Sequence, residues 1–115
     1  MSMENQSIEE IYQKPDFDIV KGSTFNLQVT FDKKLEQFYY DQLFDMIDHW
    51  TFPYKNQYVR PFRITEHKIE DNIFDFAIIV KKQIDEIDML RLMIEDLLFA
   101  FNHAGYRMIK WEYVF

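Results

Sequence analysis

One stretch of the chain alternates between apolar and polar residues more regularly than any other, and a helix-like pattern follows it directly. In FNLQVTF (residues 25–31) every second side chain is apolar. This period of two predicts a strand near residues 24–32 with one buried face and one polar face. Apolar residues then recur at intervals of three and four as far as Trp50, which predicts a helix near residues 33–50 with Asp32 as its N-cap.

Further elements of both kinds are predicted downstream. They are strands near residues 57–68, 73–81 and 106–114 and a helix near residues 85–104. Pro61 cannot donate a hydrogen bond to a neighbouring strand, so the first of these strands belongs at an edge or contains a bulge. The second is apolar on both faces, which is typical of a central strand. Asp85 is the expected N-cap of the helix, and Gly105 its expected C-terminal stop.

The order strand, helix, strand, strand, helix, strand predicts an α+β fold. It resembles the ferredoxin-like βαββαβ pattern, which implies a four-stranded antiparallel sheet of order 4-1-3-2 with both helices on one face. Residues 1–22 are expected to form an N-terminal appendage, a short helix plus an extended segment, and residues 23–115 a single α+β domain that folds without it. The safest predicted core residues are Leu27, Val29, Leu43, Ile47, Phe76, Ile78, Leu97 and Trp111.

Composition excludes several kinds of chemistry. The 115 residues contain no Cys and only 2 Gly, so disulfides, thiol catalysis and glycine-rich phosphate loops are excluded. The three histidines lack the close spacing of a zinc site, and we expect no metal and no cofactor. Without a nucleophile motif, we expect no enzyme. The polar N-terminus and short apolar runs predict neither a signal peptide nor a membrane span, which favours a cytoplasmic protein.

The charge balance favours one class of partner. With 13 Lys and Arg against 20 Asp and Glu, the formal net charge is −7, which favours a basic protein partner over phosphate backbones. The outward positions Asn26, Gln28 and Thr30 of the first strand carry no aromatic ring that could stack on RNA bases. We therefore expect no direct contact with nucleic acid.

Acidic residues mark the candidate binding surface. Asp41, Asp45 and Asp48 follow the spacing i, i+4, i+7 and share one outward face of the first helix. If both helices cover the same sheet face, their outward stripes form one continuous acidic surface. Tyr40 and Phe44 are the expected aromatic anchors at its edge. The complete set of candidate partner-binding residues is Tyr40, Asp41, Phe44, Asp45, Asp48, Asp88, Glu95 and Asp96.

Two hypotheses follow from this pattern. The first is a small acidic, non-enzymatic protein that binds and inhibits or regulates a basic or nucleic-acid-handling protein. Immunity proteins, antitoxins and phage-encoded anti-host factors have this general character, and the residue usage is compatible with an AT-rich bacterial or phage genome. The alternative is a homo-oligomeric ligand-sensing or structural domain, such as a homodimer, that uses its open sheet face. Val59, Ile79, Met108 and Val114 are the candidate contacts for that alternative.

Overall fold

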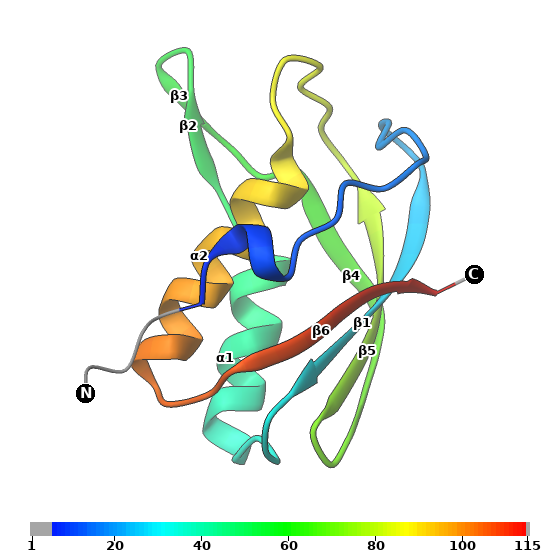
Figure 1. Ribbon diagram of the computed structural model, residues 1–115. Coiled ribbons are helices and arrows are strands. Elements are labelled where there is room, and N and C mark those ends of the chain that lie inside the picture. The colour runs from blue at the N-terminus through cyan, green and yellow to red at the C-terminus, as the bar shows by residue number, and fades with distance from the viewer. Residues whose placement is uncertain (1–5, 115) are drawn as a thin grey trace.

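A computed structural model describes residues 6–114 of the chain (Figure 1). The first five residues of the predicted appendage (1–5) and the last residue of the predicted domain (115) lie outside the described residues. The elements in chain order are η1 (Ile8–Glu10), β1 (Thr24–Phe31), α1 (Gln37–Asp48), β2 (Phe52–Tyr54), β3 (Gln57–Val59), β4 (Phe62–Glu70), β5 (Ile73–Val80), α2 (Met89–His103) and β6 (Met108–Val114).

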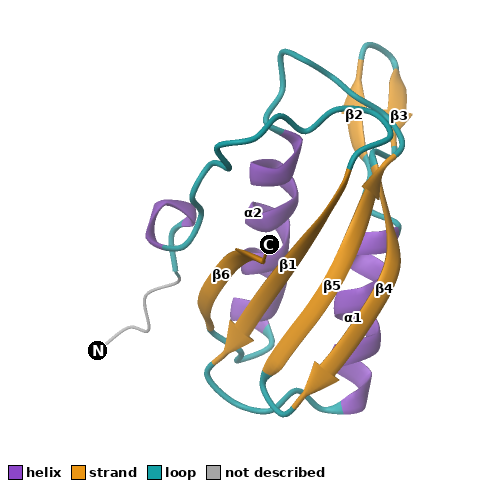
Figure 2. Ribbon diagram, turned by 90° about the vertical axis from the view of Figure 1, so that its right-hand side faces the viewer, coloured by secondary structure: helices purple, strands orange, loops and turns teal. Residues whose placement is uncertain are grey.

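Four strands form one antiparallel sheet, and two helices cover one of its faces (Figure 2). The strand order is β4-β5-β1-β6, and each neighbouring pair is antiparallel. Numbered over these four strands alone, the order reads 4-1-3-2. The predicted α+β class, the antiparallel sheet and the two helices are therefore confirmed. The plain βαββαβ description is incomplete, because a separate two-stranded hairpin lies between α1 and β4.

That hairpin corrects the predicted strand at residues 57–68. Gln57–Val59 pairs with Phe52–Tyr54 and not with the sheet. Lys55 and Asn56 at the tip both have positive φ, 47° and 65°, which is the geometry of a two-residue turn that matches strand twist. Pro61 separates the hairpin from β4, since its ring nitrogen has no hydrogen to donate.

Both helices begin later than predicted. Glu36 precedes α1, whereas Asp32 accepts a hydrogen bond from the Arg107 backbone N–H at 3.0 Å and so extends the contact of β1 with β6. At α2 the N-cap is Asp88 and not Asp85, because the Asp88 carboxylate accepts the Arg91 backbone N–H at 3.2 Å. The predicted stop at Gly105 is confirmed by its φ of +87° just after the helix.

A bulge reverses which side chains face the core in the first part of the predicted last strand. Its register against β1 shifts between Thr30 and Phe31. An extra residue at a bulge moves neighbouring side chains to the other face. As a result Met108 is buried and Ile109 is 58 % exposed, the opposite of the alternation that the sequence pattern predicts.

The core lies between the sheet and the helices, and all eight predicted core residues are buried in it. It also includes Ile8 and Ile11 from the N-terminal segment. Phe17 packs its ring against Phe25 and Tyr113, at centroid distances of 5.7 and 5.4 Å. The boundary at residue 22 stays a prediction, and removal of residues 1–22 would delete two buried core side chains.

A pair of substitutions on α2 tests this core. Leu97 is fully buried, so Leu97→Ala should lower the free energy of unfolding by about 2–5 kcal/mol through lost burial and a residual cavity. Phe99, two residues later, is 64 % exposed, and Phe99→Ala should change that energy by less than about 0.5 kcal/mol. Chemical denaturation measures both. Equal losses in the two variants would show that the helix faces are assigned wrongly.

Candidate functional site

The outward face of α1 combines acidic residues with one exposed aromatic ring. Asp41 and Asp45 are exposed, and Phe38 on the same stripe has 68 % of its surface exposed. Leu43 and Ile47 on the opposite side are buried against the sheet. Asp41 accepts a hydrogen bond from the side-chain amide of Gln37 at 2.9 Å. No ion pair to another described residue occupies Asp41 or Asp45.

The outward face of α2 repeats this combination. Glu95 and Asp96 are exposed, and Phe99 follows one turn later with 64 % of its surface exposed. The imidazole of His103 lies against the Phe99 ring, with 4.5 Å between centroids. Glu95 forms an ion pair with Arg91 at 3.5 Å, across one helical turn. This pair is exposed and therefore contributes little to stability.

The two aromatic rings lie toward the same end of the helix layer. The beginning of α1 and the end of α2 are neighbours at the lower end of the view (Figure 1). Their contact is shown by Tyr39, whose ring lies 6.5 Å from that of Phe101. Asp96 also ties α2 to the end of α1, because it accepts the indole N–H of Trp50, two residues after that helix, at 2.8 Å. We name the group Phe38, Asp41, Asp45, Glu95, Asp96 and Phe99 the outer helix surface.

Asp48, predicted in the acidic stripe, is committed to contacts within the fold. Its carboxylate accepts the Ile64 backbone N–H at 2.7 Å and pairs with the Arg60 guanidinium at 3.2 Å. The Arg60 Nε–H also donates to the backbone carbonyl of Asp48 at 2.9 Å. Asp48 therefore joins the end of α1 to the edge strand β4. A group used in this way offers little to an external partner.

Asp88 is likewise committed to the fold. Besides capping α2, its two carboxylate oxygens both lie 2.9 Å from the hydroxyl of Tyr12, which donates to them. Tyr12 belongs to the N-terminal segment, whose backbone carbonyl at Gln13 accepts the Tyr113 hydroxyl at 2.7 Å. Asp88 therefore fastens this segment to the start of α2 and lies outside the outer helix surface.

This cluster changes the acidity of two phenols. Burial raises the pKa of Tyr12 far above its ordinary value near 10, and the hydrogen bond and charge of Asp88 raise it further. Burial also raises the pKa of Tyr113, and the charge of Asp88 adds to the effect. Both phenols are therefore held in their protonated forms, which lets Tyr12 donate to the carboxylate.

The two predicted aromatic anchors pack on the sheet and are only half exposed. The Tyr40 ring lies 5.5 Å from Phe74, and its hydroxyl is hydrogen-bonded to Nδ1 of His67. The Phe44 ring lies 4.6 Å from the His67 imidazole. These contacts dock α1 onto β4 and β5. The apolar spacing of three and four in residues 33–50 includes Phe38, so that pattern alone does not mark it as exposed. Phe99 could have been found, because its spacing from Leu97 and Leu98 places it on the outward side.

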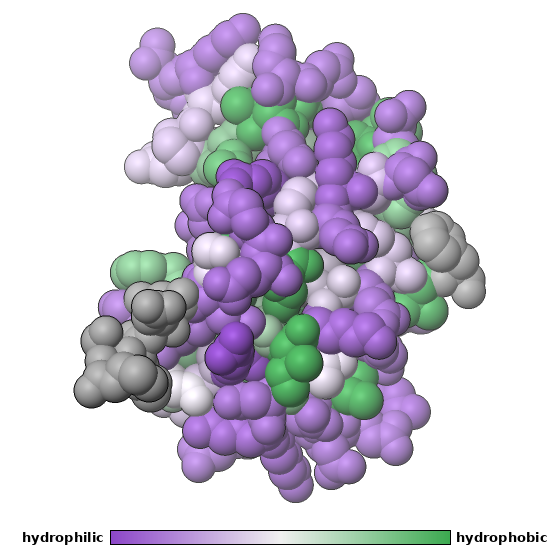
Figure 3. Space-filling model, in the orientation of Figure 1, coloured by the Kyte–Doolittle hydropathy of each residue, from purple (hydrophilic) through white to green (hydrophobic). Residues whose placement is uncertain are grey.

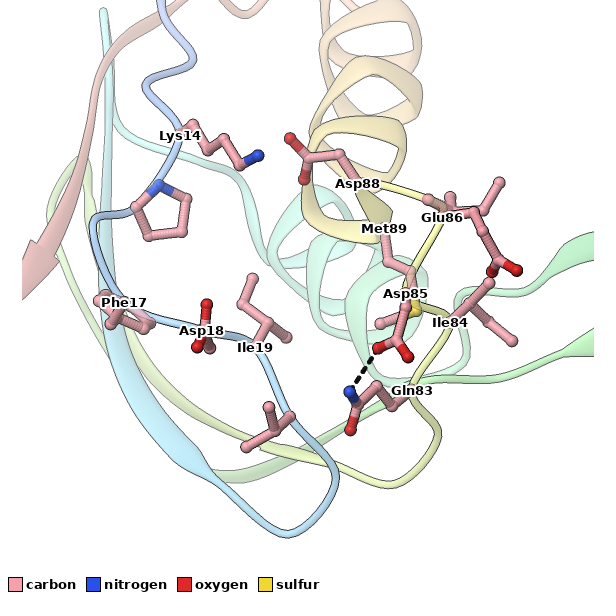
Figure 4. Close-up of a pocket in the computed structure, with 13 residues that line it drawn as sticks. Lys14, Phe17, Asp18, Ile19, Gln83, Ile84, Asp85, Glu86, Asp88 and Met89 are labelled. Atoms are coloured by element: carbon pink, nitrogen blue, oxygen red, sulfur yellow. Dashed lines mark hydrogen bonds between the residues drawn. The ribbon is translucent and has the colours of Figure 1, made fainter.

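A cleft of about 520 Å³ lies between the N-terminal segment and the loop that leads into α2 (Figure 4). Lys14 and Asp88 extend toward each other across it, and Gln83 donates a hydrogen bond to Asp85 on its other side. Among residues 6–114, no group of three or more His, Asp or Glu side chains is arranged to hold a metal ion. The cleft is bordered by opposing charges and has no enclosed polar centre.

The open sheet face offers little apolar area. Val59 and Met108, which the homo-oligomer hypothesis placed there, are 3 % and 0 % exposed and belong to the core. Val114 is partly exposed, and Ile79 is half-buried. The sheet face also carries polar side chains, and on it the Gln28 amide donates to Asp75 at 2.8 Å. The alternative hypothesis therefore loses two of its four proposed contacts.

Comparison of the chain with models of known protein families, with curated proteins and with solved structures finds no match. Within the described residues, no helix has the length and apolar character needed to cross a bilayer. Functional inference therefore depends on the surfaces of this molecule alone.

The bond between Tyr12 and Asp88 can be tested by substitution. Tyr12→Phe should lower the free energy of unfolding by about 1.5–3 kcal/mol near neutral pH, because one hydrogen bond to a charged acceptor is lost. Since the pKa of Tyr12 is raised on folding, its contribution is complete below pH 10 and is lost as the pH rises above 10. The variant should therefore lose stability less steeply than the parent in alkali, as measured by denaturation at several pH values.

Tyr58→Phe is the matched control, because it removes a hydroxyl from a ring that is 80 % exposed. Its stability should equal that of the parent at neutral pH. If Tyr12→Phe behaves in the same way as this control, the proposed fastening of the N-terminal segment is wrong.

Proposed function

We propose that the outer helix surface binds a basic protein partner and thereby inhibits or regulates it. In this proposal a ferredoxin-like framework, extended by the β2–β3 hairpin, holds two helices so that their outward stripes act together. Phe38 and Phe99 replace Tyr40 and Phe44 as the aromatic anchors. The observation that carries the proposal is the placement of these two largely exposed rings among acidic side chains.

The arrangement matches the usual anatomy of a protein interface. Binding energy concentrates in a few aromatic residues that become desolvated, while charged groups around them set orientation and association rate. An exposed Phe ring leaves apolar surface in water, which a partner can cover. The face of the molecule seen in Figure 3 is largely hydrophilic, and its apolar side chains lie in separate small areas. A few anchors in a polar frame suit a reversible complex better than an obligate dimer.

The charge pattern supports a basic partner in particular. Asp41 and Asp45 form no ion pair with the described residues, and the whole chain has a formal net charge of −7. Two copies of this chain would bring like charges together, whereas a basic protein would neutralise them. These carboxylates are exposed on the helix surface and lack the enclosed setting that acid–base catalysis uses. Binding is therefore favoured over chemistry.

Charge reversal tests the electrostatic part of the proposal. Asp41→Lys combined with Asp45→Lys should slow association with the basic partner about tenfold at low salt and leave the fold intact. The matched control is Asp16→Lys with Asp18→Lys, which makes the same change in net charge at exposed positions of the N-terminal segment. The measurement is capture from a lysate of the source cell, followed by association kinetics with the purified partner.

Truncation of the rings tests the anchors. Phe38→Ala and Phe99→Ala should each raise the dissociation rate about tenfold with little effect on the association rate. The proposal is refuted if the charge-reversed and truncated variants still bind the same basic protein with unchanged association and dissociation rates. Failure of the parent protein to capture any basic protein in stoichiometric amount would refute it as well.

A further inference from the structure

Basic residues from four separate segments lie toward one end of this acidic protein, the end that carries the β2–β3 hairpin (Figure 1). Lys81 and Lys82 follow β5, and their backbone N–H groups both donate to the carbonyl of Pro61, at 2.7 and 3.4 Å. Arg63 stands at the start of β4, opposite Ile79. Lys21 precedes Gly22, whose N–H donates to the Val80 carbonyl at 2.8 Å. With Lys55 at the tip of the hairpin, these residues form what we name the basic corner: Lys21, Lys55, Arg63, Lys81 and Lys82.

The charged groups of the basic corner are solvent-exposed, and the Lys55 Nζ lies over the Tyr54 ring, 5.1 Å from its centroid. All five side chains are exposed, and none forms an ion pair with another residue of the described range 6–114. Arg60 nearby is different, because its guanidinium is held by Asp48. Two acidic residues of the loop after β5 have partners within the fold: Glu86 accepts the Tyr54 hydroxyl at 3.2 Å, and Asp85 accepts the Gln83 amide.

An exposed aromatic ring projects beside these charges. Tyr58 on β3 has 80 % of its surface exposed, the largest fraction among the exposed large apolar side chains of the described residues. It lies three residues before Pro61, so their Cα atoms are at most about 10 Å apart. The tight turn at Lys55 and Asn56 and the buried base of the hairpin at Phe52 and Val59 hold the ring away from the core.

We propose, against the expectation drawn from net charge and the open sheet face, that the basic corner and Tyr58 bind single-stranded nucleic acid. Ammonium groups attract phosphates without selecting a base, and four of the five basic residues are lysines. A single ring with open faces can stack on an unpaired base but not on one inside a duplex. A group of lysines at the same end of the molecule as one exposed aromatic ring therefore suits a single strand of relaxed sequence preference.

The negative charge of the whole chain does not oppose this binding strongly. The molecule extends 40 Å along its longest axis, and the hairpin lies at the end opposite the beginning of α1 (Figure 1). Charges in physiological salt are screened over about 8 Å. The acidic residues of the outer helix surface therefore act weakly on a strand held at the basic corner, and this inference does not depend on the protein partner proposed above.

Fluorescence anisotropy with a labelled oligouridylate of about twelve nucleotides tests the inference on the full chain. The parent should bind at 50 mM salt and weaken steeply by 200 mM, as expected for a few phosphate contacts. Lys81→Glu with Lys82→Glu should weaken binding at least tenfold. The matched control, Lys33→Glu with Lys34→Glu, makes the same change in net charge at exposed positions between β1 and α1 and should have little effect.

A second set of variants isolates the ring. Tyr58→Ala should weaken binding about tenfold, and Tyr58→Phe should retain it, because stacking needs the ring and not the hydroxyl. Far-ultraviolet circular dichroism confirms that each variant is folded. The inference is overturned if the parent does not bind the oligomer at 50 mM salt, or if the two lysine pairs weaken binding equally. It is also overturned if polyglutamate or a duplex of equal length binds as tightly, since the corner would then recognise acidic chains or phosphates in general.

Discussion

The central strand β1 sets the arrangement of the whole domain. It pairs with β5 on one side and β6 on the other, and its alternating side chains Phe25, Leu27, Val29 and Phe31 are all buried. A strand with one apolar face must have that face covered, and both helices lie on it (Figure 2). The opposite face is left polar. Each helix consequently has one side against the sheet and one side in solvent, and the outward sides become neighbours.

Local patterns were enough to predict this framework. The alternation in residues 25–31, the apolar run of β5 and the stop at Gly105 each arise from side chains close together in sequence. The eight predicted core residues belong to such patterns, and all are buried. Errors occurred where two local signals competed. Asp32 and Asp85 are good N-cap residues, yet Asp32 instead bonds to Arg107, and α2 is capped by Asp88.

Features that depend on distant partners could not be predicted in this way. The bulge that exposes Ile109 is set by the register of β6 against β1, and no periodicity within β6 reports it. Asp48 resembles the other members of an acidic stripe, but Arg60 and Ile64 occupy it. Asp88 is occupied by Tyr12, 76 positions away. The basic corner could not be predicted for the same reason. Its residues are scattered through the sequence, and the pairing of β4 with β5 and the backbone contacts around Val80 and Pro61 bring most of them to one end of the sheet.

The contact between Gln6 and Met108 also bears on how this protein reaches its folded state. The Gln6 side chain accepts the Met108 backbone N–H at 3.0 Å, across 102 positions of sequence. β1 and β6, which pair directly, are separated by most of the chain as well. Closing such long loops costs conformational entropy before the contacts that reward it have formed, and domains rich in distant pairings fold more slowly than helical bundles. Until the final strand docks, one hydrogen-bonding edge of β1 stays open to other chains. The interval before β6 arrives is therefore the period in which this aromatic-rich protein is most exposed to aggregation.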